Sequence, residues 1–222
     1  MAVTNRRAQL SDEVASYLRQ AIMAGEMAPG SSVRADAVGE ALEVSATPVR
    51  EALQALRVEG FLELLPRRGF VVVPLVADDI RDLFEAHALI AGELTARAAV
   101  RANDSQTDTL LAIHRELMDA ADRGDYEMLE SKNHEFHKLV YRMSGSERLR
   151  WALGNFARYV PRAFYTQIPG WPETTAHDHS EVINAIVARD TKAAREAMAQ
   201  HIRNSGEKLA EYFEGRQLAS GE

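Results

Sequence analysis

From Asp78 to the end of the chain, apolar residues recur almost throughout with the period of an α-helix. Short polar or glycine-containing breaks divide this stretch into six expected helices. Their approximate ranges are 78–102, 106–122, 125–143, 147–165, 173–188 and 190–213. Long helices joined by short links favour antiparallel packing. The pattern therefore predicts an antiparallel all-α bundle over residues 77–222.

The preceding residues, 1–76, have a different pattern. Apolar spacing predicts helices over about 10–24 and 35–42 and a third that begins near Ser45, with Thr47 as its cap and Pro48 in its first turn. Two β-like runs follow, at 61–65 and 69–73, joined by Pro66-Arg67-Arg68. This order predicts a winged helix-turn-helix domain with a small β-hairpin, so the whole chain is expected to be mainly α.

Composition excludes several kinds of protein. Among the 222 residues there is no cysteine, which rules out a disulfide framework and a thiolate metal site and fits a reducing cytoplasm. No apolar run approaches the roughly 20 residues of a membrane-spanning helix, so no membrane partner is expected. The net charge of −7 argues against indiscriminate nucleic-acid coating, but residues 1–76 balance eight arginines against nine acidic residues.

The predicted helix-turn-helix carries side chains suited to the major groove. A helix N-terminus with small polar residues can approach phosphates through its free N–H groups. An exposed arginine can read a guanine edge or hold a phosphate. The candidates are Ser45, Thr47 and Arg50 on the third helix, Arg34 before the second, and Arg67 and Arg68 on the hairpin tip.

Histidines suggest a metal site in the predicted bundle. Asn133 and His137 are four residues apart and project from one face of a helix, while His179 and His201 lie on two other helices. Three imidazoles leave coordination positions open on zinc, nickel or a similar divalent ion. The alternative is that each histidine is an ordinary core or surface residue, because the sequence alone does not bring helices together.

The N-terminal part resembles the DNA-binding domain of the GntR family of bacterial transcription regulators. The matching blocks are 28–30, 44–53, Leu56, Gly60 and 67–71. The resemblance implies that operator DNA is contacted by Arg34, Ser45, Thr47, Arg50, Arg68 and Gly69. The family usually has arginine where this chain has Ala46, which implies an atypical operator or greater reliance on Arg50 and Arg34.

Residues 78–215 resemble the helical ligand-binding domain of the FadR subfamily. The matching blocks include Leu83-Phe84-Glu85, Asn133 with Phe136-His137, His179 with Ala185-Ile186, and Met198 with His201-Ile202. In metal-binding members an Asp or Asn and three histidines hold a divalent ion, which implies Asn133, His137, His179 and His201 here. His134 and His177 do not match. Because an amide is neutral, Asn133 would leave the site near +2, which weakens metal binding but attracts an anion.

The subfamily typically senses small organic acids, so a small carboxylate effector is expected at the open positions of the metal. His87 stands where the family often has an arginine, and Ala91 replaces its usual glutamate partner. Arg158 and Arg162, four residues apart, are expected to form cationic pocket walls, although a solvated helix face fits them equally well. Trp151 and Phe156 are expected in the core.

Together these features predict a cytoplasmic, homodimeric transcription regulator that is not an enzyme. It would bind a near-palindromic operator, with a carboxylate effector and a divalent ion, zinc or nickel, in its helical domain. Two other classes of protein remain open. One is a metal-dependent hydrolase, for which the sequence offers no clear general base. The other is an adaptor that keeps the helix-turn-helix for protein contacts and binds no DNA.

Overall fold

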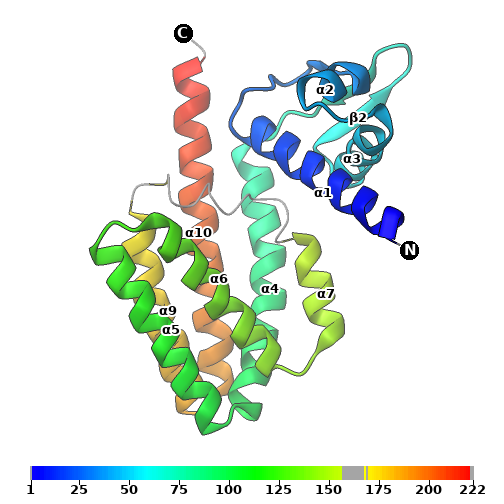
Figure 1. Cartoon of the computed structure of the whole chain (residues 1–222). Coiled ribbons are helices and arrows are strands. Elements are labelled where there is room, and N and C mark those ends of the chain that lie inside the picture. Colours follow the sequence, from blue (N-terminus) through cyan, green and yellow to red (C-terminus); the bar gives the residue numbers. More distant parts are fainter. Residues whose placement is uncertain (1, 157–167, 169, 221–222) are drawn as a thin grey trace. The chain divides into compact units, whose positions relative to one another are not determined.

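The computed structural model describes residues 2–156, 168 and 170–220 (Figure 1). The chain divides into two compact units, one that ends at Leu75 and one that begins at Val76. Within the described ranges, no helix is both long enough and apolar enough to cross a bilayer.

The N-terminal unit is a three-helix domain with a small antiparallel sheet. Its elements are α1 (Ala2–Met23), β1 (Ser32–Val33), α2 (Ala35–Ala41), α3 (Ala46–Val58), β2 (Leu62–Leu65) and β3 (Gly69–Val72). The strand order is β1-β3-β2, and Leu62 pairs with Val72 across the hairpin. The predicted winged helix-turn-helix is therefore confirmed. The strand β1 was not predicted, because two residues are too few to show a periodic pattern.

The turn between α2 and α3 requires close backbone packing. A Cβ atom on Gly39 would lie 2.7 Å from the carbonyl oxygen of Val44, so this position needs glycine. Val49, Leu53 and Leu56 are buried on one face of α3, as their spacing predicts. The prediction that Thr47 caps this helix is wrong. The helix already begins at Ala46, and its N-cap residue makes no side-chain capping hydrogen bond.

The second unit is entirely helical in its described part, which confirms the predicted fold class. Its helices are α4 (Ala77–Arg101), α5 (Asp104–Asp122), α6 (Tyr126–Met143), α7 (Glu147–Phe156), α9 (Trp171–Val187) and α10 (Thr191–Ser220). Polar residues in the predicted breaks begin two of them, because Asn103 accepts from the backbone N–H of Gln106 and Asp125 from that of Met128. The end of the expected helix 147–165 lies outside the described residues.

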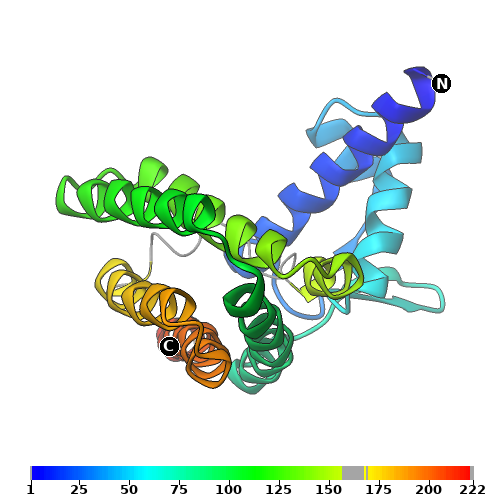
Figure 2. The same ribbon diagram turned by 90° about the horizontal axis from the view of Figure 1, so that it is seen from below.

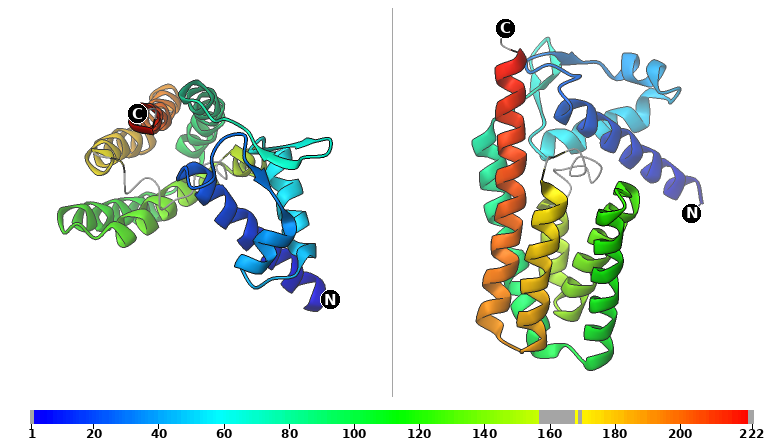
Figure 3. Two further views of the ribbon diagram at one scale, coloured as in Figure 1. Left: turned by 90° about the horizontal axis from the view of Figure 1, so that it is seen from above. Right: turned by 90° about the vertical axis from the view of Figure 1, so that its left-hand side faces the viewer.

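Five of these helices form a closed ring of neighbours. Helix α4 contacts α10, α10 contacts α9, α9 contacts α5, α5 contacts α6, and α6 contacts α4 (Figures 2 and 3). Helix α7 lies beside the ring against α4 and α6. The ring thus encloses a common interior to which each of its five helices can contribute side chains.

The position of Trp151 corrects one expectation. Its side chain is 69% exposed on α7, so the prediction that it belongs to the core is wrong. In the part of the chain that the structure describes, α7 packs mainly against α4 and lies outside the ring, which leaves this side chain uncovered. The side chain of Phe156 lies outside the described residues.

Helices α4 and α10 make the most extensive contact of the ring. A Cβ atom added to Gly206 of α10 would lie 2.5 Å from the Cβ and Cγ atoms of Phe84, and one added to Gly92 of α4 would lie 2.8 Å from the carbonyl oxygen of Arg195. Arg203 also forms a two-bond ion pair with Glu85, with distances of 2.6 and 2.8 Å. Small residues thus let the two helices approach closely.

The Gly206 contact predicts a clear difference between two alanine substitutions in α10. Gly206→Ala is expected to be less stable than Gly215→Ala by about 1–3 kcal/mol, because only the first forces atoms to overlap. Gly215 is the control, since a Cβ atom added there would have nothing within 4 Å and alanine favours a helix. Urea unfolding of both variants measures the difference, and equal stability would contradict the close packing.

Candidate functional site

Each helix of the ring contributes one histidine to the interior. These are His87 from α4, His114 from α5, His137 from α6, His179 from α9 and His201 from α10. Ring contacts link several of them, including His179 with His114, His137 and His201. His114 was missed by the sequence reasoning, although its spacing between the buried Leu110 and Leu117 indicates an inward face.

Three of these histidines form a candidate metal centre. One ligand nitrogen from each of His137, His179 and His201 lies within 4.8 Å of the other two. The Nε2 atoms of His137 and His201 are 3.2 Å apart. His179 is fully buried and stacks on Phe136, with ring centroids 3.8 Å apart. Three predicted ligands from three different helices are therefore brought together.

Several buried polar atoms at this cluster have no hydrogen-bond partner. Both ring nitrogens of His179 are buried without a hydrogen-bond partner, and so is Oδ1 of Asn133, one helical turn before His137. A buried polar atom without a partner costs about 1–3 kcal/mol. Imidazole nitrogens and an amide oxygen are suitable donors for a divalent transition metal, so the residues fit such an ion.

Hydrogen bonds to the Nδ1 atoms orient the rings of His137 and His201. Nδ1 of His201 lies 3.3 Å from Oδ2 of Asp178, and Nδ1 of His137 lies 3.2 Å from the Tyr141 hydroxyl. The same hydroxyl lies 3.8 Å from the sulfur of Met198, and the direction of its hydrogen bond with His137 follows the tautomer of that ring. A hydrogen on Nδ1 of each ring would leave both Nε2 lone pairs available to a metal ion. Asp178 and Tyr141 were missed by the sequence reasoning.

Burial favours the neutral form of two of these imidazoles. It lowers the pKa of His137 and His179 well below the ordinary value, and the neighbouring imidazoles lower it further. Burial also raises the pKa of the Asp178 carboxyl, but hydrogen bonds from His201 and Asn204 outweigh this and hold the pKa below its usual value. The site therefore combines two imidazoles that burial holds in the neutral form, which is the form that binds metals, with an ionised carboxylate beside His201.

Of the three predicted effector-binding residues, only His87 lies among the described residues. Burial, together with the nearby His201, lowers the pKa of His87 to about 4, so this ring is neutral at physiological pH. His87 thus borders the candidate metal centre from α4. Arg158 and Arg162 lie outside the described residues.

All seven predicted DNA-contacting residues are exposed on the N-terminal unit. They are Arg34, Ser45, Thr47, Arg50, Arg67, Arg68 and Gly69. Ser45, Thr47 and Arg50 lie at the start of α3, whose first N–H groups have no partner within the helix. The guanidinium of Arg68 donates to the carbonyl oxygen of Gly30 at 2.8 Å, which holds the hairpin tip against the loop before β1. Their contact with DNA stays a prediction.

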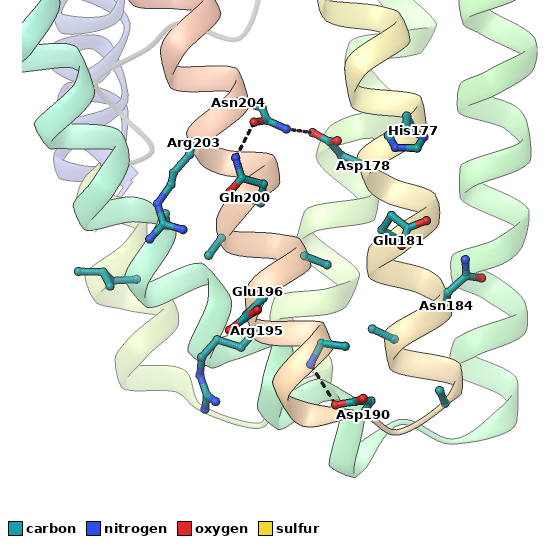
Figure 4. Close-up of a pocket in the computed structure, with 17 residues that line it drawn as sticks. His177, Asp178, Glu181, Asn184, Asp190, Arg195, Glu196, Gln200, Arg203 and Asn204 are labelled. Atoms are coloured by element: carbon teal, nitrogen blue, oxygen red, sulfur yellow. Dashed lines mark hydrogen bonds between the residues drawn. The ribbon is translucent and has the colours of Figure 1, made fainter.

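A surface groove of about 1040 Å³ lies along α9 and α10 (Figure 4). Its lining contains several alanines, and its charged rim includes Asp178, Glu181 and Glu196. The two arginines of the rim are paired with carboxylates of α4, Arg195 with Glu93 and Arg203 with Glu85. Asp178 therefore borders both this groove and the histidine cluster.

Comparisons with known proteins agree with this architecture. Residues 10–72 match the model of bacterial regulatory proteins of the gntR family, and residues 82–204 match the FCD domain. The HTH-type transcriptional repressor RspR of Escherichia coli is 25% identical over 90% of this chain and 89% of its own. An uncharacterized HTH-type transcriptional regulator in an unstable DNA locus of Streptomyces ambofaciens is 29% identical over 91% of this chain and 86% of its own. The solved structure of E. coli McbR/YncC, 21% identical, covers 92% of this chain and 98% of its own with a TM-score of 0.68.

Proposed function

The chain belongs to the GntR family of bacterial transcription regulators and carries a C-terminal FCD domain. We propose that it is a repressor that needs a bound metal ion and whose affinity for operator DNA is changed by a small organic acid. Its families and relatives are regulators and not enzymes, which removes the hydrolase alternative. The adaptor alternative loses support for the same reason. The relative RspR is named a repressor, and this supports the same direction of control here.

One observation carries the metal part of the proposal. The Nε2 atoms of His137 and His201 are 3.2 Å apart, while the Nδ1 atom of each ring has a hydrogen-bond partner. The ring nitrogens of His179 and Oδ1 of Asn133 are buried and have no hydrogen-bond partner. Asn133, His137, His179 and His201 would hold the ion, with zinc or nickel favoured by imidazole donors. A bound divalent ion would supply Lewis acidity and positive charge in the interior.

The neutral ligands determine which effector suits this site. Three imidazoles and one amide do not cancel the charge of a divalent ion, so an anionic group is attracted to its open positions. A small carboxylate fits this requirement. The chain's own contribution is to exclude water and orient the acid, with His87 as a neutral neighbour and Arg158 and Arg162 as predicted cationic walls.

A homodimer would give the regulator two DNA-reading domains and hence a near-palindromic operator. Helix α4 offers a surface for a second copy. Leu89 and Val100 are 62% and 61% exposed, and a spacing of eleven residues places them on the same helix face. Sedimentation of the wild-type chain as a dimer and of Leu89→Asp as a monomer is expected. A wild-type monomer at every concentration would contradict the dimer.

The metal proposal is tested on protein purified without added metal. Elemental analysis is expected to find a divalent transition metal, and His179→Ala should weaken zinc binding by on the order of 100-fold or more through loss of a ligand. His177→Ala is the control, because His177 is exposed two residues away and outside the cluster. Chelator competition measures both affinities. Equal zinc affinity of the two variants would contradict the site.

Asn133→Asp tests the charge of the site. The added carboxylate is expected to strengthen zinc binding and to weaken binding of acetate or succinate to the zinc-loaded protein, because one unit of positive charge is cancelled. Calorimetric titration with each acid measures the second effect. Stronger binding of the acids by the variant would contradict an anionic effector at the metal.

Arg50→Ala tests the DNA-reading surface. An operator is first selected from random DNA by the wild-type protein. Loss of an arginine contact to guanine removes about 1–3 kcal/mol, so the variant is expected to bind roughly 5–150-fold more weakly. Arg57→Ala is the matched control, since Arg57 is exposed at the far end of the same helix.

Two outcomes would count against the regulatory mechanism. Undiminished DNA binding by Arg50→Ala would remove α3 from the interface. Operator binding that is indifferent to chelator and to every small acid tried would separate the helical domain from control of DNA binding. A tenfold change in occupancy needs only about 1.4 kcal/mol of differential affinity, so gel-shift titrations resolve the effect.

A further inference from the structure

Asp178 connects the outside of the helical unit with its interior. It lies on α9 directly before His179, and its side chain is only 11% exposed. One side of the residue borders the groove of Figure 4, and its Oδ2 faces Nδ1 of the buried His201. Within the described residues, no other carboxylate forms a hydrogen bond with the three clustered histidines.

A chain of amide groups on α10 holds this carboxylate in place. Nε2 of Gln200 donates to Oδ1 of Asn204 at 2.8 Å, and Nδ2 of Asn204 donates to Oδ2 of Asp178 at 2.9 Å, as the dashed lines of Figure 4 show. The same oxygen lies 3.3 Å from Nδ1 of His201. Asp178 is therefore fixed by two groups of α10 that are three residues apart.

The direction of this hydrogen bond determines the tautomer of His201. An ionised carboxylate can only accept, so Nδ1 of His201 must carry the hydrogen. In the neutral ring the lone pair then lies on Nε2, which is the atom 3.2 Å from Nε2 of His137. His137 has a neutral phenol behind it in Tyr141. Asp178 thus gives His201 a charged partner that neither of the other two histidines has in the described part of the chain.

We infer that Asp178 is a positioning residue of the metal centre, which locks His201 in its metal-binding tautomer and supplies negative charge from behind it. The inference rests on the proposed metal centre. A carboxylate that accepts from a ligand histidine raises the donor strength of that histidine. Asn133 is a neutral ligand, so Asp178 provides the charge that the ligand set itself lacks. It does so without occupying a coordination position, which stays open for an acid.

Asp178→Asn tests this role, with Glu181→Gln as the matched control. Both variants remove one charge from the same groove rim on α9, but Glu181 is exposed and lies outside the histidine cluster. Chelator competition on the full chain is expected to show about 10–100-fold weaker zinc binding for Asp178→Asn and little change for Glu181→Gln. The visible spectrum of cobalt-loaded protein should shift only in Asp178→Asn.

A second readout needs no metal. Nitrogen NMR of the metal-free protein, labelled at histidine, is expected to show the hydrogen of His201 on Nδ1 in the wild type and a mixture of tautomers in Asp178→Asn. A purely structural role would leave this ratio unchanged. If Asp178→Asn does not fold, Asn204→Ala serves instead, because it keeps the carboxylate but removes its anchor. A zinc affinity lower than that of the wild type supports the inference.

The failures are distinguishable. Wild-type protein that binds neither zinc nor cobalt would overturn the metal centre and this inference with it. Wild-type protein that binds both metals, together with variants whose zinc affinity and His201 tautomer match it, would overturn the role of Asp178 alone.

Discussion

The helical unit is organised around histidines that are buried or half-buried between its helices. Five helices close into a ring, and each places one histidine in the shared interior. Burial of polar nitrogens is unfavourable unless each finds a partner, and burial also favours the neutral form of His87, His137 and His179. In the proposed metal centre, a bound cation would supply the partner that the buried nitrogens of His179 lack. Because each of the five helices carries one of these histidines, the placement of every helix affects the geometry of the histidine cluster.

Much of this architecture follows from local patterns in the sequence. Helix bounds were predicted within a few residues for most of the described helices, because apolar spacing and polar breaks such as Asn103 and Asp125 act within one or two turns. The same locality explains the errors. Whether Trp151 is covered depends on neighbours of α7 that are distant in sequence, and β1 exists only through its pairing with β3.

The site shows the same division. Spacing alone predicts that Asn133 and His137 share a helix face. Only the resemblance to a family predicts that they lie near His179 and His201. The hydrogen-bond partners of these residues could not be predicted in this way. Asp178 meets His201 across two helices, and the role of Tyr141 depends on the direction of a single hydroxyl hydrogen. His114 is the exception, because its spacing on α5 already marks an inward position.

The close approach of α4 and α10 has a mechanical consequence. Glycines bring the two helices into tight contact, and the Arg203–Glu85 and Arg195–Glu93 ion pairs cross between them, so they behave as one stiff double rod. His201 sits on one member of this rod and His87 on the other. Because close packing resists sliding of one helix along the other, these two histidines keep a nearly fixed separation within the helical unit.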